Sequence, residues 1–185
     1  FTPFKLLYVG TLNNRNISQT IEGFYIFLKS NPRINNISYD IIGDGNEFIR
    51  LKQLIESFKL SKQVTIHGRI PHFELKPFFE NCNIGISYVP MTDYYEYQPV
   101  TKTFEYILSG MVCIATNTYE NSILINENNG VLCDDNPKSF AKAIEEVVNN
   151  HAKYDSNAIR NSLKDYSWGI IVENKLKPVL EMHYS

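Results

Sequence analysis

The chain has 185 residues, of which 43% are hydrophobic and 21% are charged, and its formal net charge is −2. The length suffices for one domain with a proper core, and the small net charge excludes the field that binds nucleic acid or an anionic membrane. Apolar runs stay below the roughly eighteen residues of a membrane span, so we expect a soluble globular protein.

Six short apolar segments predict buried β-strands. Most of them are uniformly apolar rather than alternating, which is typical of a parallel sheet covered on both faces. The predicted strands are residues 4–10, 38–43, 63–68, 83–89, 112–117 and the shorter 130–134.

Amphipathic patterns between these segments predict helices, two of which begin with proline. Pro71 and Pro137 are expected in the first turn, where the missing N–H costs nothing. The alternation of strands and helices predicts right-handed βαβ units and an α/β fold, with a doubly wound, Rossmann-like parallel sheet and helices on both faces. These helices are expected at residues 18–30, 46–60, 71–82 and 137–150.

The two ends of the chain differ from this pattern. From His151 to Ser185 only helix-like patterns occur. We expect residues 1–150 to form the Rossmann-like domain and residues 151–185 to form C-terminal helices that pack on it or reach toward a neighbour. Phe1 leads directly into a strand, without an initiator methionine or a secretory signal, which predicts a piece of a longer protein.

Cysteine and histidine usage favours a reduced protein without a metal. Cys82, Cys113 and Cys133 are an odd number and form no C-x-x-C pair, so we expect buried thiols in the cytoplasm. The four histidines lack metal-ligand spacing, and there is no D-x-D motif. No metal and no cofactor are therefore predicted.

Ligands of a doubly wound sheet bind beyond the carboxyl ends of the strands, so the loops at that edge should carry the site. The first such loop lacks the G-x-G-x-x-G motif, and no P-loop occurs in the chain. Gly43 and Gly45 fit a tight turn as well as a ligand loop. A nicotinamide enzyme or an ATPase therefore has no supporting motif.

Residues 98–110 place Lys102 and Glu105 at the start of a helix that follows the fourth predicted strand. An exposed salt bridge between them would contribute only about 0.2–0.5 kcal/mol, and Glu105 has the wrong offset for a capping box. Because this helix opens at the ligand edge, its free N–H groups and Lys102 suit a diphosphate. Glu105 can accept hydrogen bonds from ribose hydroxyls, so the stretch predicts a nucleotide site.

The motifs Y-V-G-T-L, I-I-G-D-G, V-T-I-H-G-R-I-P and P-V-T-K-T-F-E-Y-I-L-S-G follow one another in the order typical of a known family. Over roughly residues 4–150 the chain resembles the donor half of glycosyltransferase family 4, the retaining GT-B enzymes also called group 1 glycosyl transferases. The resemblance implies one half of a GT-B enzyme, which binds a nucleotide sugar (UDP or GDP) and transfers the sugar to a glycan or lipid-linked acceptor. It also implies a missing N-terminal domain of the same chain, without which the fragment is expected to be inactive.

The resemblance also implies roles for individual residues. Glu105 would hold the ribose hydroxyls, Lys102 and nearby backbone amides the diphosphate, and the H-G-R-I-P loop the base. The implied catalytic residues are Glu96, Lys102 and Glu105. The implied nucleotide-sugar site comprises Gly10, Thr11, Arg15, Arg69, Ile70, Tyr97, Val100, Thr101, Lys102 and Glu105.

The chain departs from the family pattern in its first loop. Many members have an arginine directly after the first-strand glycine and a lysine five residues later, and both contact the phosphates. Here these positions hold Thr11 and Asn16. We expect Arg15, the nearest basic residue, to substitute for them.

A second departure concerns the loop before Lys102. The family often has a further glutamate near the transferred sugar, eight positions before the ribose-binding one, where this chain has Tyr97. Either Glu96 serves after a shift of one residue, or this carboxylate is absent. Tyr94, Tyr95 and Tyr97 could line a sugar pocket or pack on a neighbour.

Other functions fit parts of the pattern. A non-catalytic nucleotide-binding module would share Lys102 and Glu105, whereas a GT-B sugar-nucleotide epimerase would need catalytic carboxylates and histidines in loops where this chain has none. The sequence leaves open the base, the sugar, the acceptor and the oligomeric state. The resemblance implies a place in the cytoplasm or at the cytoplasmic face of the membrane, in polysaccharide or lipid glycosylation.

Overall fold

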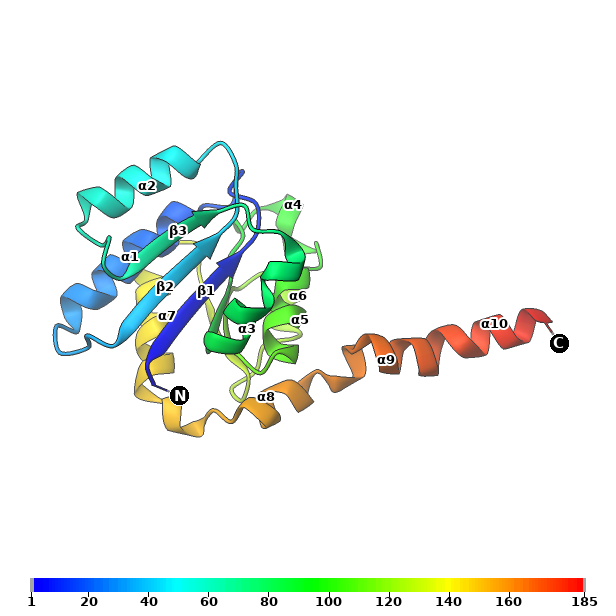
Figure 1. Ribbon diagram of the computed structural model, residues 1–185. Coiled ribbons are helices and arrows are strands. Elements are labelled where there is room, and N and C mark those ends of the chain that lie inside the picture. The colour runs from blue at the N-terminus through cyan, green and yellow to red at the C-terminus, as the bar shows by residue number, and fades with distance from the viewer. Residues whose placement is uncertain (1, 185) are drawn as a thin grey trace.

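Six parallel strands form one sheet in the order β3-β2-β1-β4-β5-β6, in a computed structural model that describes residues 2–184 (Figure 1). The strand order reverses between β1 and β4, so the doubly wound topology predicted from the sequence is confirmed. The strands are β1 (Phe4–Val9), β2 (Ile37–Ile42), β3 (Val64–Gly68), β4 (Ile84–Ser87), β5 (Val112–Thr116) and β6 (Gly130–Cys133).

The central strands are buried because helices cover both faces of the sheet. Every residue of β4 and of β5 is buried, as expected for uniformly apolar strands. β1 and β2 pair in register from Phe4 opposite Ile37 to Val9 opposite Ile42. The two strands therefore end side by side, and the loops that follow them emerge together.

Two helical layers enclose the sheet. One layer holds α1, α2 and α7, with α1 and α7 packed side by side, and the other holds α3 and α5 (Figure 1). The helices of the domain are α1 (Ile17–Ser30), α2 (Phe48–Ser57), α3 (Lys76–Asn81), α4 (Asp93–Glu96), α5 (Thr101–Leu108), α6 (Tyr119–Ser122) and α7 (Pro137–Asn149).

Of the two helix starts predicted at prolines, one is confirmed and the other is wrong. Pro137 lies in the first turn of α7, as predicted. Pro71 does not open a helix over residues 71–82: it precedes a short 3-10 turn, His72–Glu74, and α3 starts afresh with Pro77 in its first turn. A continuous helix would lose the hydrogen bond of Pro77 and force its ring against the carbonyl group four residues earlier.

The chain beyond α7 first packs on the domain and then leaves it. In α8, Arg160 donates hydrogen bonds to the carbonyl groups of Leu108 and Ser109 at the end of α5, at 3.0 and 3.2 Å. Trp168 and Ile171 still line a cavity with Phe104 of α5, and the tail beyond them extends away from the sheet (Figure 1). That residues 151–185 pack on the domain or reach toward a neighbour stays a prediction. The elements are a 3-10 turn (His151–Lys153), α8 (Ser156–Ser162), a second 3-10 turn (Lys164–Tyr166), α9 (Trp168–Ile171), a π-helical turn (Val172–Leu176) and α10 (Lys177–Tyr184).

The π-helical turn precedes Pro178. In it the N–H of Lys177 donates to the carbonyl group of Val172, five residues earlier. Pro178 has no N–H and would clash with the carbonyl group four residues before it, so the chain widens just ahead of the proline.

The sequence predicts a boundary between two segments of the chain at residue 150. This boundary stays a prediction, and the outer limits of the two segments, Phe1 and Ser185, lie outside the described residues.

Cys82, Cys113 and Cys133 are free and buried, as expected, and burial raises the pKa of Cys82 to about 12. No helix within residues 2–184 is long and apolar enough to cross a membrane.

Candidate functional site

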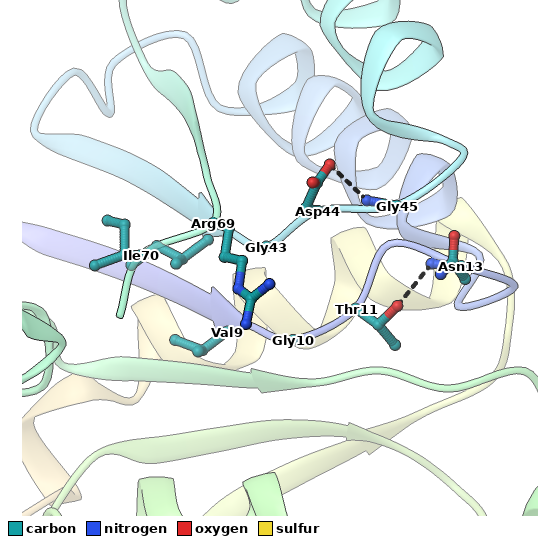
Figure 2. A pocket seen from close by; sticks show the side chains of 10 residues that line it. Val9, Gly10, Thr11, Asn13, Gly43, Asp44, Gly45, Arg69 and Ile70 are labelled. Atoms are coloured by element: carbon teal, nitrogen blue, oxygen red, sulfur yellow. Dashed lines mark hydrogen bonds between the residues drawn. The ribbon is translucent and has the colours of Figure 1, made fainter. Parts of the chain in front are cut away.

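The carboxyl edge of the sheet carries a cavity of about 460 Å³ between the loops after β1, β2 and β3 (Figure 2). The Arg69 side chain extends from the third of these loops toward Val9 and Gly10 (Figure 2). The cavity includes four residues that the sequence analysis singled out for a nucleotide site, and six others. Its lining is Val9, Gly10, Thr11, Asn13, Ile42, Gly43, Asp44, Gly45, Arg69 and Ile70.

Lys102 reaches from α5 to the end of β1. A Cβ atom added to Gly10 would meet the Nζ atom of Lys102 at 2.8 Å and would also overlap its Cε atom, so only glycine lets the ammonium group come this close to the backbone. The Nζ atom also lies 5.4 Å from the centre of the Tyr8 ring. Burial, together with the nearby charge of Arg15, lowers the pKa of Lys102 to about 8.

The start of α5 is open and firmly held. Val100 at the N-cap makes no side-chain cap hydrogen bond, so the positive end of the helix dipole stays available. Thr103 Oγ1 lies 2.8 Å from Ser87 Oγ on β4 and donates to Asn121 Oδ1 on α6 at 2.6 Å. These buried contacts fix the turn that carries Lys102.

Glu105 lies in a neighbouring cavity of about 510 Å³, which shares Val9 with the first one. Its other lining residues include His72 and Lys76. Partial burial raises the pKa of the Glu105 carboxyl group, and the charges of Lys102 and His72 oppose this shift. Lys102 and Glu105 form no ion pair in the described part of the chain, so a surface salt bridge does not account for the two residues.

Arg15 lies on the loop after β1, at the same edge. Its guanidinium carbon stands 4.7 Å from the centre of the Tyr95 ring. The next residue, Asn16, donates from Nδ2 to Asp135 Oδ2 at 2.8 Å, so its side chain is engaged within the protein. Thr11 Oγ1 accepts from the N–H of Asn13 at 3.2 Å.

Glu96 and Tyr97 contact α6 instead of lining either cavity. Glu96 Oε1 accepts from the N–H of Tyr119 at 3.0 Å. The Tyr97 ring lies 5.3 Å from the Tyr119 ring and is 69% exposed. The structure therefore gives Glu96 a contact at the start of a helix, and the catalytic role for it stays a prediction.

Several residues of the site were missed by the sequence analysis. Asn13 Oδ1 accepts from the N–H of Asn46 at 2.7 Å and joins the loops after β1 and β2. Asp44 closes a tight turn by accepting from the N–H of Gly45. The sequence did predict a turn at Gly43 and Gly45, and this turn could have pointed to these residues. It identifies a ligand loop only when its closeness to the end of β1 is known. Within residues 2–184 no group of three or more His, Cys, Asp or Glu side chains could hold a metal ion.

Comparison with known families matches residues 2–165 to the model described as "Glycosyl transferases group 1". No curated protein sequence matches the chain significantly.

Solved structures with the same fold share little sequence with the chain. The pneumococcal O-GlcNAc transferase GtfA, in complex with UDP and GlcNAc, is 18% identical with a TM-score of 0.79, over 99% of this chain and 36% of that one. An S. aureus TarM mutant, in a complex that includes UDP, is 21% identical with a TM-score of 0.73, over 96% and 36%. The catalytic domain of the Helicobacter pylori cholesterol-α-glucosyltransferase is 19% identical with a TM-score of 0.68, over 89% and 100%. The chain thus spans about a third of the first two structures, and it has the fold of one half of a GT-B glycosyltransferase.

Proposed function

The chain belongs to the group 1 glycosyl transferases, and on this basis we propose that it is the donor-binding domain of a retaining glycosyltransferase. Its ligand is a nucleoside-diphosphate sugar. The close approach of the Lys102 ammonium group to the backbone of Gly10, at the open start of α5, is the observation that carries this proposal.

Each part of such a donor finds a suitable group at the site. A diphosphate meets Lys102, Arg15 and the first turn of α5, because a helix N-terminus and two cations favour an anion. The ribose hydroxyls meet Glu105, which lines the neighbouring cavity. Val9 connects this cavity to the one beside Arg69 and Ile70, where the base is cradled.

The same charges act in the reaction. Negative charge develops on the diphosphate as the bond to the sugar breaks, and Lys102 and Arg15, already in place, stabilise it. The oxygen of an acceptor hydroxyl group bonds to the sugar on the face from which the diphosphate leaves, and the hydroxyl proton passes to the departing diphosphate. With these cations present, the proposal includes no metal and no cofactor.

The acceptor in this proposal is a glycan or a lipid-linked sugar, bound mainly by an N-terminal domain of the same chain. Solved relatives contain UDP beside a sugar or sugar derivative, which supports a nucleotide-sugar donor. The 185 residues alone should bind nucleotide weakly and transfer no sugar. We place the protein in the cytoplasm or at the cytoplasmic face of the membrane.

Titration calorimetry with UDP, GDP and ADP tests the nucleotide site. We expect one of the three to bind and Glu105→Ala to weaken it about 10- to 100-fold, the loss of a hydrogen bond to a charged group. Wild type should also bind the 2′-deoxy form of that nucleotide less tightly, and Glu105→Ala should lose this preference.

The exposed glutamate Glu56 on α2 gives a matched control. Glu56→Ala removes the same charge far from the site and should bind nucleotide like wild type. If none of the three nucleotides binds at millimolar concentration, or if Glu105→Ala keeps the wild-type affinity, the proposed site is wrong.

A further inference from the structure

Tyr95 joins the loop that follows β4 to the loop that follows β1. Its ring lies under the guanidinium group of Arg15, at 4.7 Å from ring centre to Cζ. Its hydroxyl group donates to the carbonyl group of Asn14 at 3.4 Å. One side chain thus contacts both the cation of the first loop and the backbone beside that cation.

The backbone around Arg15 is fixed on both sides. Asn14 and Asn16 adopt left-handed conformations, with φ of 52° and 53°, which asparagine tolerates better than most residues. Asn16 is also held by its hydrogen bond to Asp135. The direction in which Arg15 leaves the loop is therefore set before any ligand binds.

The guanidinium group itself has few polar contacts within the protein. The Nε atom of Arg15 is buried without a hydrogen-bond partner, and Arg15 takes part in no ion pair in the part of the chain that the structure describes. The face of the Tyr95 ring is thus the contact that orients the guanidinium group. Apart from the buried Nε atom, its N–H donors make no hydrogen bond within residues 2–184 and remain for a ligand.

We propose that Tyr95 is a positioning residue, which holds the Arg15 guanidinium group beside Lys102 in readiness for the diphosphate of the donor. This inference rests on the proposed function. A flexible side chain that is ordered before binding loses less conformational freedom when the ligand arrives, so affinity rises without a new contact to the ligand. Tyr95 compensates in this way for the neutral residues Thr11 and Asn16, because it leaves the one cation of the loop well placed.

NMR shift titrations of the 185-residue chain with UDP and with uridine test this role. We expect Tyr95→Leu to weaken UDP binding about two- to fivefold, the value of an exposed cation–π contact, and to leave uridine binding unchanged. Tyr95→Phe keeps the ring and should retain most of the affinity. In an Arg15→Gln background, Tyr95→Leu should cause no further loss.

Tyr25 provides the matched control, because Lys29 lies 5.4 Å over its ring and neither residue lines the two cavities of the site. Tyr25→Leu should leave UDP binding unchanged. Equal losses for UDP and uridine, or a Tyr95→Leu effect that persists in the Arg15→Gln background, would show a merely structural role and overturn the inference.

Failure of this inference can be told from failure of the proposed function. If Glu105→Ala weakens UDP binding but Tyr95→Leu does not, the nucleotide site stands and the role of Tyr95 is wrong. If the wild-type chain binds no nucleotide, both fall.

Discussion

The substitution Gly10→Ala tests the contact between β1 and Lys102 without removing a charge. The added methyl group would stand 2.8 Å from the Nζ atom of Lys102 and 3.1 Å from the Tyr8 hydroxyl group, and would overlap the Cε atom of Lys102. Gly10 is not among the residues with positive φ, so alanine fits the backbone. The lysine tip, as the flexible partner, must move away.

The expected effects on binding and on stability differ in size. Displacing the ammonium group removes a charge-assisted hydrogen bond to the diphosphate, worth about 1.5–3 kcal/mol, so UDP affinity should fall about 10- to 100-fold. The free energy of unfolding should change by less than about 1 kcal/mol, because only the end of a long side chain moves.

Calorimetric titration with UDP and urea unfolding of the same samples measure the two quantities. Gly169 on α9 is the control, because a Cβ atom there meets nothing within 4 Å. Gly169→Ala should leave UDP affinity unchanged and should stabilise the helix slightly. In a Lys102→Ala background, Gly10→Ala should cost no further affinity.

Two results would refute this reasoning. Wild-type UDP affinity in Gly10→Ala would show that the position of the lysine tip does not matter for the ligand. An affinity loss of the same size in the Lys102→Ala background would show that the methyl group acts on the ligand or the loop and not on Lys102.

Three further predictions concern the same helix. The folded chain lowers the pKa of Lys102 from 10.5 to about 8, so UDP affinity should fall as the pH rises through about 8. Calorimetric titrations between pH 7 and 9 measure this fall. It should be absent in Lys102→Met. The same shift means that the unfolded chain binds more protons between about 8 and 10.5, so the contribution of Lys102 to stability rises with pH there, and Lys102→Met should be more stable than wild type in urea at pH 7. Thr103→Val leaves Ser87 and Asn121 without their buried partner and should lower the free energy of unfolding by about 1–3 kcal/mol. Thr2 is exposed, so Thr2→Val should leave the free energy of unfolding unchanged in the same urea titration.

The strands were predicted to within one or two residues because the sheet is buried on both faces. A run such as residues 112–115 is then apolar throughout, and this signal does not depend on the neighbouring strands. The start of α3 was misplaced because the sequence contains two prolines, Pro71 and Pro77, and either one suits the first turn of a helix. Only the packed chain shows that Pro77 occupies the first turn and that Pro71 stands before a separate 3-10 turn.

The candidate site was predictable where local sequence and topology sufficed. Lys102 follows a predicted strand at the start of a helix, which places it at the ligand edge. Its closeness to Gly10 and the support from Thr103 join segments far apart in the sequence, so they depend on strand order and register. The contact of Glu96 with the N–H of Tyr119 depends in the same way on where the loop after β5 lies.

The widened turn ahead of Pro178 lies between the short helix α9 and helix α10 of the C-terminal tail. Helices bend most readily at a proline or a π-type bulge, and here both coincide within a few residues. We therefore expect bending of the tail to concentrate at this turn. Such bending should leave the start of α5 in place, because Thr103 anchors it to β4 and α6.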